Sequence, residues 1–200
     1  MNSDIKIIDN VIPRGYADQI EQDLLRTSFP WYYIDDVTNI NYGNNSGLAH
    51  VAFDIGKSPT EWFPFIKPII YSIEEASGFE IDQLLRIRVG FLSKSADPAY
   101  TFNTPHVDFM SPHYTACYYA TDSDGDTIVF DQSTKEVGTP DLSEKVLQDY
   151  VAKTNFTIAD RASPKKGRVC IFDGLRFHAS TKPTQHNRRL VITINYVGKK

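Results

Sequence analysis

The sequence predicts a mainly β protein with helices near its N-terminus. Up to Gly78, apolar residues recur at helical spacing in two segments, whereas beyond Gly78 seven short runs rich in β-branched and aromatic residues follow one another. Gly, Pro, Asp and Ser separate these runs, as they do at turns. Aromatic residues make up 12% of the chain, which also favours strands. The pattern is typical of a sandwich, a jelly roll or a barrel.

The N-terminal part is expected to contain one short strand and two helices. The strand covers residues 5–9, and the first helix covers about 13–26, with proline at its first position. Residues 58–61 (Ser-Pro-Thr-Glu) predict a capping box that starts the second helix, which ends at Gly78. Pro68 is expected to kink the middle of this helix, because its ring cannot fit a regular turn.

Strands account for most of the remaining chain. The other predicted strands are residues 31–37, 50–55, 84–93, 105–109, 113–120, 126–132, 155–162, 167–174 and 189–197. The acidic segment 122–126 does not complete a calcium loop, so Asp124-Gly125 is predicted to form a hairpin turn between two strands. Residues 138–153 are expected to be either a surface helix or a long loop.

Length and charge restrict the class of protein. The 200 residues carry no repeat or linker and predict one domain, in which 1–83 support a core formed by 84–197. The net charge of −4 argues against nucleic acid as a partner. No segment predicts a membrane span or a signal peptide, so we expect a cytoplasmic protein, and nothing indicates its oligomeric state. Both cysteines stand in apolar runs, which predicts small buried side chains.

His106 and Asp108 stand two positions apart in a predicted strand and should therefore share one of its faces. Such a pair alone fits a structural hydrogen bond as well as it fits two metal ligands. A non-haem Fe(II) site needs a second histidine from a distant strand. His178 is a candidate, because it follows a turn at Asp173-Gly174 and has the small residues Ala179 and Ser180 beside it; taken alone, it fits an ordinary surface-loop histidine equally well.

The last predicted strand places an arginine in the interior. Alternation puts Arg189, Val191, Thr193 and Asn195 on one face, and four apolar residues on the other. The apolar face should pack under the helices, so that Arg189 and Thr193 point into the barrel. A guanidinium group there is costly unless it meets an anion. Arg188 is the competing candidate, although alternation directs it to the helix-covered face.

The set His106-x-Asp108, His178 and Arg189 resembles the Fe(II)- and 2-oxoglutarate-dependent dioxygenases, closest to their prolyl-hydroxylase-like branch. The resemblance covers roughly residues 84–197 and implies a double-stranded β-helix, that is, a cupin-like jelly roll flanked by helices. It also implies an enzyme that uses Fe(II), 2-oxoglutarate and O2 to hydroxylate a peptidyl or small-molecule substrate, with release of succinate and CO2.

The resemblance further implies roles for single residues. His106, Asp108 and His178 would hold Fe(II), and Arg189 would bind the far carboxylate of 2-oxoglutarate with help from Thr193. The predicted strand 113–120 would add the hydroxyl of Tyr119 and the packing of Cys117; Tyr119 fits a plain core aromatic equally well. The carboxylate at Asp108 disfavours halogenation, because related halogenating enzymes lack that ligand.

Substrate choice stays open. The strand 84–93 has Phe91 where prolyl-hydroxylase-like enzymes often have tyrosine, and a long loop, 93–105, is the expected place for substrate. Arg86 and Arg88 share a face, and they either select an anionic substrate or form salt bridges at the rim. Two alternatives remain: a jelly-roll binding module without turnover, and a cupin-like metalloenzyme that does not use 2-oxoglutarate.

Overall fold

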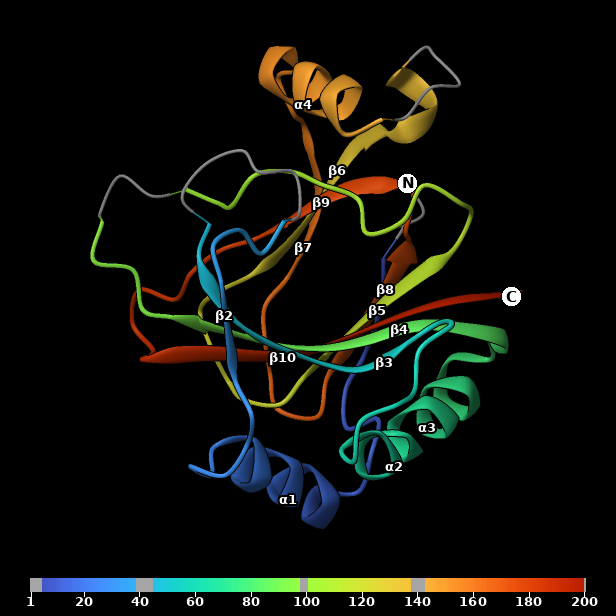
Figure 1. The fold of residues 1–200 in the computed structure, drawn as a ribbon, viewed down its shortest axis with the longest axis vertical. Helices are drawn as coiled ribbons and strands as arrows, with labels where there is room; N and C mark the ends of the chain where they lie inside the picture. The colour runs from blue at the N-terminus through green and yellow to red at the C-terminus, as the bar shows by residue number, and fades with distance from the viewer. Residues whose placement is uncertain (1–4, 39–44, 98–100, 138–142, 200) are drawn as a thin grey trace.

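Two antiparallel sheets form the centre of the computed structural model, which describes residues 5–38, 45–97, 101–137 and 143–199 (Figure 1). The larger sheet has seven strands in the order β1-β8-β5-β10-β4-β3-β2, and the smaller has three in the order β7-β6-β9. The strands of the larger sheet are β1 (Lys6–Ile8), β2 (Tyr32–Ile34), β3 (Gly47–Asp54), β4 (Glu80–Ser93), β5 (Tyr114–Tyr119), β8 (Val169–Asp173) and β10 (Arg188–Lys199). The smaller sheet contains β6 (Thr127–Ser133), β7 (Ile158–Ala162) and β9 (Arg176–Ser180). The predicted mainly β class is confirmed.

Helices cover the outer face of the larger sheet. α1 (Arg14–Leu24), α2 (Phe63–Ile66) and α3 (Pro68–Ser77) lie together below that sheet in Figure 1. The residues Leu190, Ile192, Ile194 and Tyr196 of β10 are buried in one cluster with apolar residues of these helices. The predicted alternation of β10 is therefore confirmed, and it leaves the other face of the strand for the interior.

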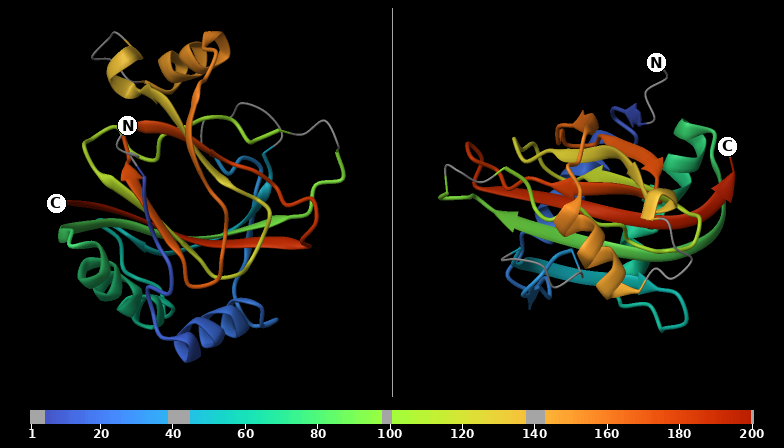
Figure 2. Two further views of the ribbon diagram at one scale, coloured as in Figure 1. Left: turned by 180° about the vertical axis from the view of Figure 1, so that it is seen from behind. Right: turned by 90° about the horizontal axis from the view of Figure 1, so that it is seen from above.

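The fourth helix belongs to the other side of the molecule. α4 (Glu144–Lys153) lies beside the smaller sheet, and a short 3-10 turn (Thr134–Val137) precedes it in the chain (Figure 2). Leu147 and Val151 of α4 pack against Phe130 and Phe177 of the small sheet. The helical alternative for 138–153 is thus correct from Glu144 onward, and residues 138–142 lie outside the described residues.

The predicted capping box at 58–61 is wrong. Thr60 is held by strand β3 instead, because its backbone N–H donates to the carbonyl of Ala52 and its hydroxyl lies 3.0 Å from His50 Nε2. The helix consequently begins only at Phe63. Pro68 interrupts it as expected and separates α2 from α3, and Gly78 ends α3 in the left-handed conformation.

Two predicted strand features are also wrong. Asp124-Gly125 is not a hairpin turn, because β5 and β6 belong to different sheets and this segment crosses between them. The predicted strand 105–109 reduces to a single antiparallel bridge between His106 and His178. The sequence predicts a turn at Asp173-Gly174 with His178 just beyond it. In the structure His178 lies within a separate strand, β9.

Within the described residues, no helix combines the length and the apolar character that crossing a membrane requires.

Ile192→Ala should lower the free energy of unfolding by about 2–5 kcal/mol, because it opens a cavity where the helices pack on β10. Ile192 is fully buried, whereas Val51 on β3 is 41% exposed. Val51→Ala is therefore the control and should cost less than about 1 kcal/mol. Urea denaturation of both variants measures the difference; equal losses would show that this packing is not central to the fold.

Candidate active site

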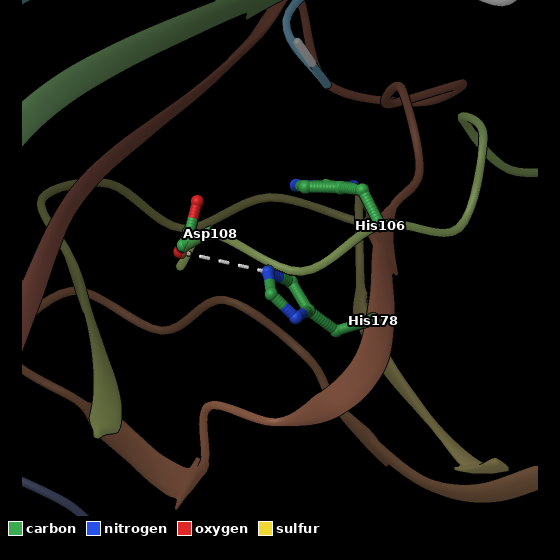
Figure 3. A group of neighbouring side chains, drawn as sticks. All are labelled: His106, Asp108 and His178. Carbon is green, nitrogen blue, oxygen red and sulfur yellow. Dashed lines mark ion pairs between the residues drawn. The ribbon is translucent and has the colours of Figure 1, made fainter. Parts of the chain in front are cut away.

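His106, Asp108 and His178 come together at the inner side of β9 (Figure 3). Two backbone hydrogen bonds link His106 and His178 reciprocally, at 3.0 and 2.9 Å, so that the loop carrying His106 lies along the strand carrying His178. One ligand atom from each of the three side chains lies within 4.8 Å of the other two. The two-residue spacing of His106 and Asp108 thus places both side chains on one side, although a loop rather than a strand holds them.

Backbone carbonyls fix the protonation of both imidazole rings. His106 Nδ1 lies 3.1 Å from the carbonyl of Thr104, and His178 Nδ1 lies 3.2 Å from the carbonyl of Arg176. A carbonyl oxygen only accepts, so each Nδ1 carries the proton and donates it. Each Nε2 is then left with its lone pair, which is the arrangement that a metal-binding histidine needs.

Two side chains hold the Asp108 carboxylate by hydrogen bonds, and His178 lies close to it. Arg86 donates to Oδ1 at 2.6 Å, Asn195 donates to Oδ2 at 2.9 Å, and His178 Nε2 lies 3.7 Å from Oδ2. The Asn195 amide also donates to Thr115 Oγ1, which keeps it in position on β10. The Asp108 side chain is only 5% exposed, so its orientation depends on these partners.

Burial and charge keep the histidines neutral and the aspartate ionised. Burial, reinforced by the neighbouring His178, lowers the pKa of His106 to about 3, and burial also lowers the pKa of His178. Burial alone would raise the pKa of Asp108, but the Arg86 guanidinium and the two histidines reverse this effect and hold it below its usual range. Two neutral imidazoles beside one carboxylate form a suitable donor set for a divalent cation.

A cavity opens beside these three residues and extends along the inner face of β10. It encloses about 650 Å³ including its mouth, and it is lined by both sheets. The lining residues are Val37, Leu48, Arg86, Arg88, Gly90, Phe91, Leu92, His106, Asp108, Cys117, Thr127, His178, Ala179, Ser180, Arg189, Val191 and Thr193. Six of the seven predicted site residues therefore share one cavity, and Tyr119 is the exception.

Arg189 lies in this cavity and is 4% exposed. Its Nε donates to the carbonyl of Gly125 at 2.7 Å, and one terminal nitrogen donates to Thr127 Oγ1 at 2.8 Å. Among the described residues no carboxylate forms an ion pair with it. A buried guanidinium anchored only by neutral oxygens leaves room for an anionic ligand.

Arg188 and Tyr119 are placed differently. Arg188 lines a separate depression on the outside, together with Glu21 of α1 and Lys166. Tyr119 is fully buried behind the cavity rather than along it, and its hydroxyl lies 2.7 Å from Thr127 Oγ1, which also accepts from Arg189. Tyr119 therefore contacts Arg189 in two ways: through the shared Thr127 hydroxyl, and directly, because the guanidinium carbon of Arg189 lies 5.8 Å from the centre of the Tyr119 ring.

Sequence reasoning missed the roles of Thr127 and Asn195. Alternation did place Asn195 on the inner face of β10, but nothing in the sequence pairs it with Asp108, 87 positions away. Thr127 stands in a run that predicts only a strand. The loop 93–105, expected near the substrate, contributes no described residue to the cavity lining; Phe102 packs against Phe130, and 98–100 lie outside the described residues.

The three remaining histidines have structural contacts. His113 is buried, and its Nδ1 lies 2.8 Å from the carbonyl of Ser111. His50 lies between the carbonyl of Pro30 and the hydroxyl of Thr60, and His186 contacts Asp124 at the surface. Asp124 also accepts the backbone N–H groups of residues 184–186, so the acidic segment stabilises a loop. Among the described residues, the His106, Asp108 and His178 group is the only cluster that fits a metal ion.

Comparison with known proteins identifies the fold. No family model matches the chain, and no curated protein matches its sequence. The solved structure of the epimerase SnoN from nogalamycin biosynthesis, in complex with Fe3+, alpha ketoglutarate and nogalamycin RO, is similar with a TM-score of 0.61 and 14% identity, covering 98% of this chain and 79% of SnoN.

Two further solved structures extend the likeness. A prolyl-4-hydroxylase from Pseudomonas putida has a TM-score of 0.55 and 10% identity, covering 100% of this chain and 94% of its own. A member of the 2OG-Fe(II) oxygenase family from Burkholderia pseudomallei has a TM-score of 0.61 and 13% identity, covering 98% and 86%. The chain thus has the jelly-roll fold of the 2-oxoglutarate- and Fe(II)-dependent oxygenases, prolyl-4-hydroxylases included, and the predicted fold is confirmed.

In the metal-free protein, the free energy of unfolding should fall as the pH falls from 6.5 toward 3. The folded-state pKa of His106 is depressed from 6.5 to about 3, so the unfolded chain takes up protons in this window that the folded chain does not. The contribution of His106 is complete above pH 6.5 and is lost below it, at most about 1.4 kcal/mol per pH unit. Urea denaturation in EDTA between pH 5 and pH 8 would measure it, with these pH limits chosen roughly to bracket the titration.

The double variant His106→Gln/His178→Gln should flatten this pH dependence. His186→Gln, which removes a histidine at the surface, should leave the drop in stability in place. A double variant whose stability falls as steeply as that of the wild type would contradict the assignment.

Proposed function

We propose that the protein is an Fe(II)- and 2-oxoglutarate-dependent oxygenase that hydroxylates a small molecule or a protein side chain, with release of succinate and CO2. The observation that carries the proposal is the pairing of two features in one cavity. His106, Asp108 and His178 offer two nitrogens and one oxygen, and Arg189 offers a buried cation without an acidic partner among the described residues.

The donor set fits Fe(II). Two histidines and one carboxylate on one side of a metal form the facial triad of non-haem Fe(II) oxygenases, with positions left open for ligands. The Nε2 lone pairs of His106 and His178 face the same space as Asp108. The bonds from Arg86 and Asn195 keep the carboxylate ionised and oriented, as outer partners of metal ligands do.

Arg189 would bind the far carboxylate of 2-oxoglutarate. Its two bonds to Gly125 and Thr127 fix the guanidinium plane, and the remaining N–H donors can pair with a carboxylate in fork geometry. Thr193 stands four residues after Arg189 on the same face of β10 and lines the same cavity. Cys117 on β5 is its register partner. Tyr119 would act by holding Thr127 in place.

The chain supplies positioning and a partly apolar wall. Once bound, Fe(II) and 2-oxoglutarate together would supply the oxygen-activating chemistry. Leu92 and Val191 form the apolar part of the cavity wall. A binding module without turnover does not explain the oriented donor set of His106, Asp108 and His178. A metalloenzyme that does not use 2-oxoglutarate does not explain the buried Arg189.

Anaerobic addition of Fe(II) and 2-oxoglutarate should produce a weak visible charge-transfer band, and admission of O2 should release succinate. His106→Ala and Asp108→Ala should weaken Fe(II) binding and abolish succinate release, because each removes one of three ligands. His186→Ala serves as the control at the surface and should keep both signals. Wild-type succinate release by either triad variant would refute the metal site.

Arg189→Gln should weaken 2-oxoglutarate binding by about tenfold to a hundredfold, since it removes a charge-assisted bidentate contact. Arg188→Gln is a matched control on the neighbouring residue, because Arg188 faces away from the cavity and should leave the affinity unchanged. Titration of the charge-transfer band measures both. Equal affinities in the two variants would overturn the role of Arg189, and a loss in Arg188→Gln alone would reverse the assignment.

A further inference from the structure

The cavity beside the triad contains more positive charge than the metal and cosubstrate account for. Among the residues that the structure describes, its lining includes three arginines, Arg86, Arg88 and Arg189, but a single carboxylate, Asp108. The lining therefore carries two uncompensated positive charges.

Binding of Fe(II) and 2-oxoglutarate does not remove this surplus, because a dication and a dianion cancel. Arg189 is matched by the cosubstrate's far carboxylate in the proposed function, and Arg86 is matched by Asp108. One of the two surplus charges then belongs to Fe(II), because the near carboxylate balances only half of its charge. Arg88 carries the other and is the arginine that stays unmatched. A partly buried guanidinium without a counter-charge is unfavourable, so a further anion is the natural partner.

The contacts of Arg88 leave its guanidinium largely uncommitted. Within the described chain it makes one hydrogen bond, in which a terminal nitrogen donates to the carbonyl of Val37 at 2.9 Å. Asp108 and Asp36 are close enough to favour its charged form, but Asp108 is bonded to Arg86, and neither carboxylate forms an ion pair with Arg88. The Nε and the other terminal nitrogen can therefore donate to a ligand in the cavity.

Arg88 and Arg189 are anchored in different directions. Arg88 pairs in register with Thr193 and reaches toward Val37, in the segment that follows β2. Arg189 reaches toward Gly125 and Thr127, at the start of β6 in the smaller sheet. One molecule of 2-oxoglutarate on Arg189 thus leaves Arg88 available to a second ligand.

The register also places Arg88 close to the triad. Arg86 stands two residues before Arg88 on the same face of β4 and bonds Asp108 directly. Two residues along a strand span about 7 Å. An anion on Arg88 therefore lies near enough to the metal ligands that a carbon a few bonds away from it can reach the reaction centre.

We propose that the substrate is a small organic acid whose carboxylate or phosphate group is bound by Arg88. The apolar side chains of Leu92 and Val191, which alternation places on the inner faces of β4 and β10, would contact its carbon skeleton. This inference rests on the proposed function for the identity of the reaction, whereas the anion site itself depends only on the charges and contacts of the cavity.

The test is a binding screen by ligand-observed NMR on protein loaded with Zn(II), a redox-silent substitute for Fe(II), and 2-oxoglutarate. The probes are small carboxylic acids, phosphate monoesters, and the amide and alcohol analogues of both. We expect binders among the acids and not among their neutral analogues. The two acid sets distinguish a carboxylate from a phosphate as the recognised group.

Arg88→Gln should weaken the binding of the acids by about tenfold to a hundredfold while the affinity for 2-oxoglutarate stays unchanged. Arg88→Lys keeps the charge without the fork and should give an intermediate loss. Arg14→Gln is the matched control, since the Arg14 side chain is 94% exposed on α1 and should bind as the wild type does. Thermal unfolding checks that each variant is folded.

Several outcomes overturn the inference: no binder among the acids at millimolar concentration, equal binding of neutral analogues, unchanged acid binding in Arg88→Gln, or a loss of 2-oxoglutarate in that variant. Failure of the proposed function gives a different result. If acids bind in a way that depends on Arg88 but no succinate is released, the anion site stands and the oxygenase function is refuted. If succinate is released but neutral analogues bind as well as the acids, the oxygenase function stands and the anion site is refuted.

Discussion

The division of β10 into two chemically different faces is the constraint on which the rest of the structure depends. Its apolar face, which includes Leu190 and Ile192, is buried under the three helices of the larger sheet. Because side chains alternate strictly along a strand, this burial obliges Arg189, Thr193 and Asn195 to face the interior. A shift of register by one residue would exchange the faces and bury a guanidinium among helices, so the packing that stabilises the fold also fixes the polar side of the cavity.

The polar face of β10 in turn orients groups that lie far away in the sequence. Asn195 holds Asp108, and Arg189 joins β10 to Gly125 and Thr127 at the start of the smaller sheet. The pairing of His106 with His178 then places a loop residue against β9. Each of these contacts crosses between separate segments, so the metal donors and the arginine are held by the closure of the two sheets and not by any one element.

The sequence was informative where a pattern has a local physical cause. Alternation predicted which arginine of the Arg188-Arg189 pair faces inward. The backbone properties of Pro68 and Gly78 predicted the break between α2 and α3 and the end of α3. It failed where tertiary contacts override local signals. Residues 58–61 look like a capping box, but Thr60 within them bonds to His50 and to strand β3. Asp124-Gly125 looks like a hairpin turn, although the strands on either side of it belong to different sheets. The partnership of Asn195 with Asp108 had no sequence signal at all, because it is defined by the fold alone.

The charge of the cavity links stability to occupancy. Three arginines around one carboxylate repel one another in a partly buried space, which costs free energy in the empty protein and is tolerated because the surrounding sheets are well packed. A ligand that binds only the folded chain recovers part of that cost, so each bound anion stabilises the protein in proportion to its affinity. Selectivity follows from the same charges. A neutral molecule of equal size gains no ion pair from Arg88 or Arg189, and an organic cation beside them is repelled, so these two arginines select anions as ligands.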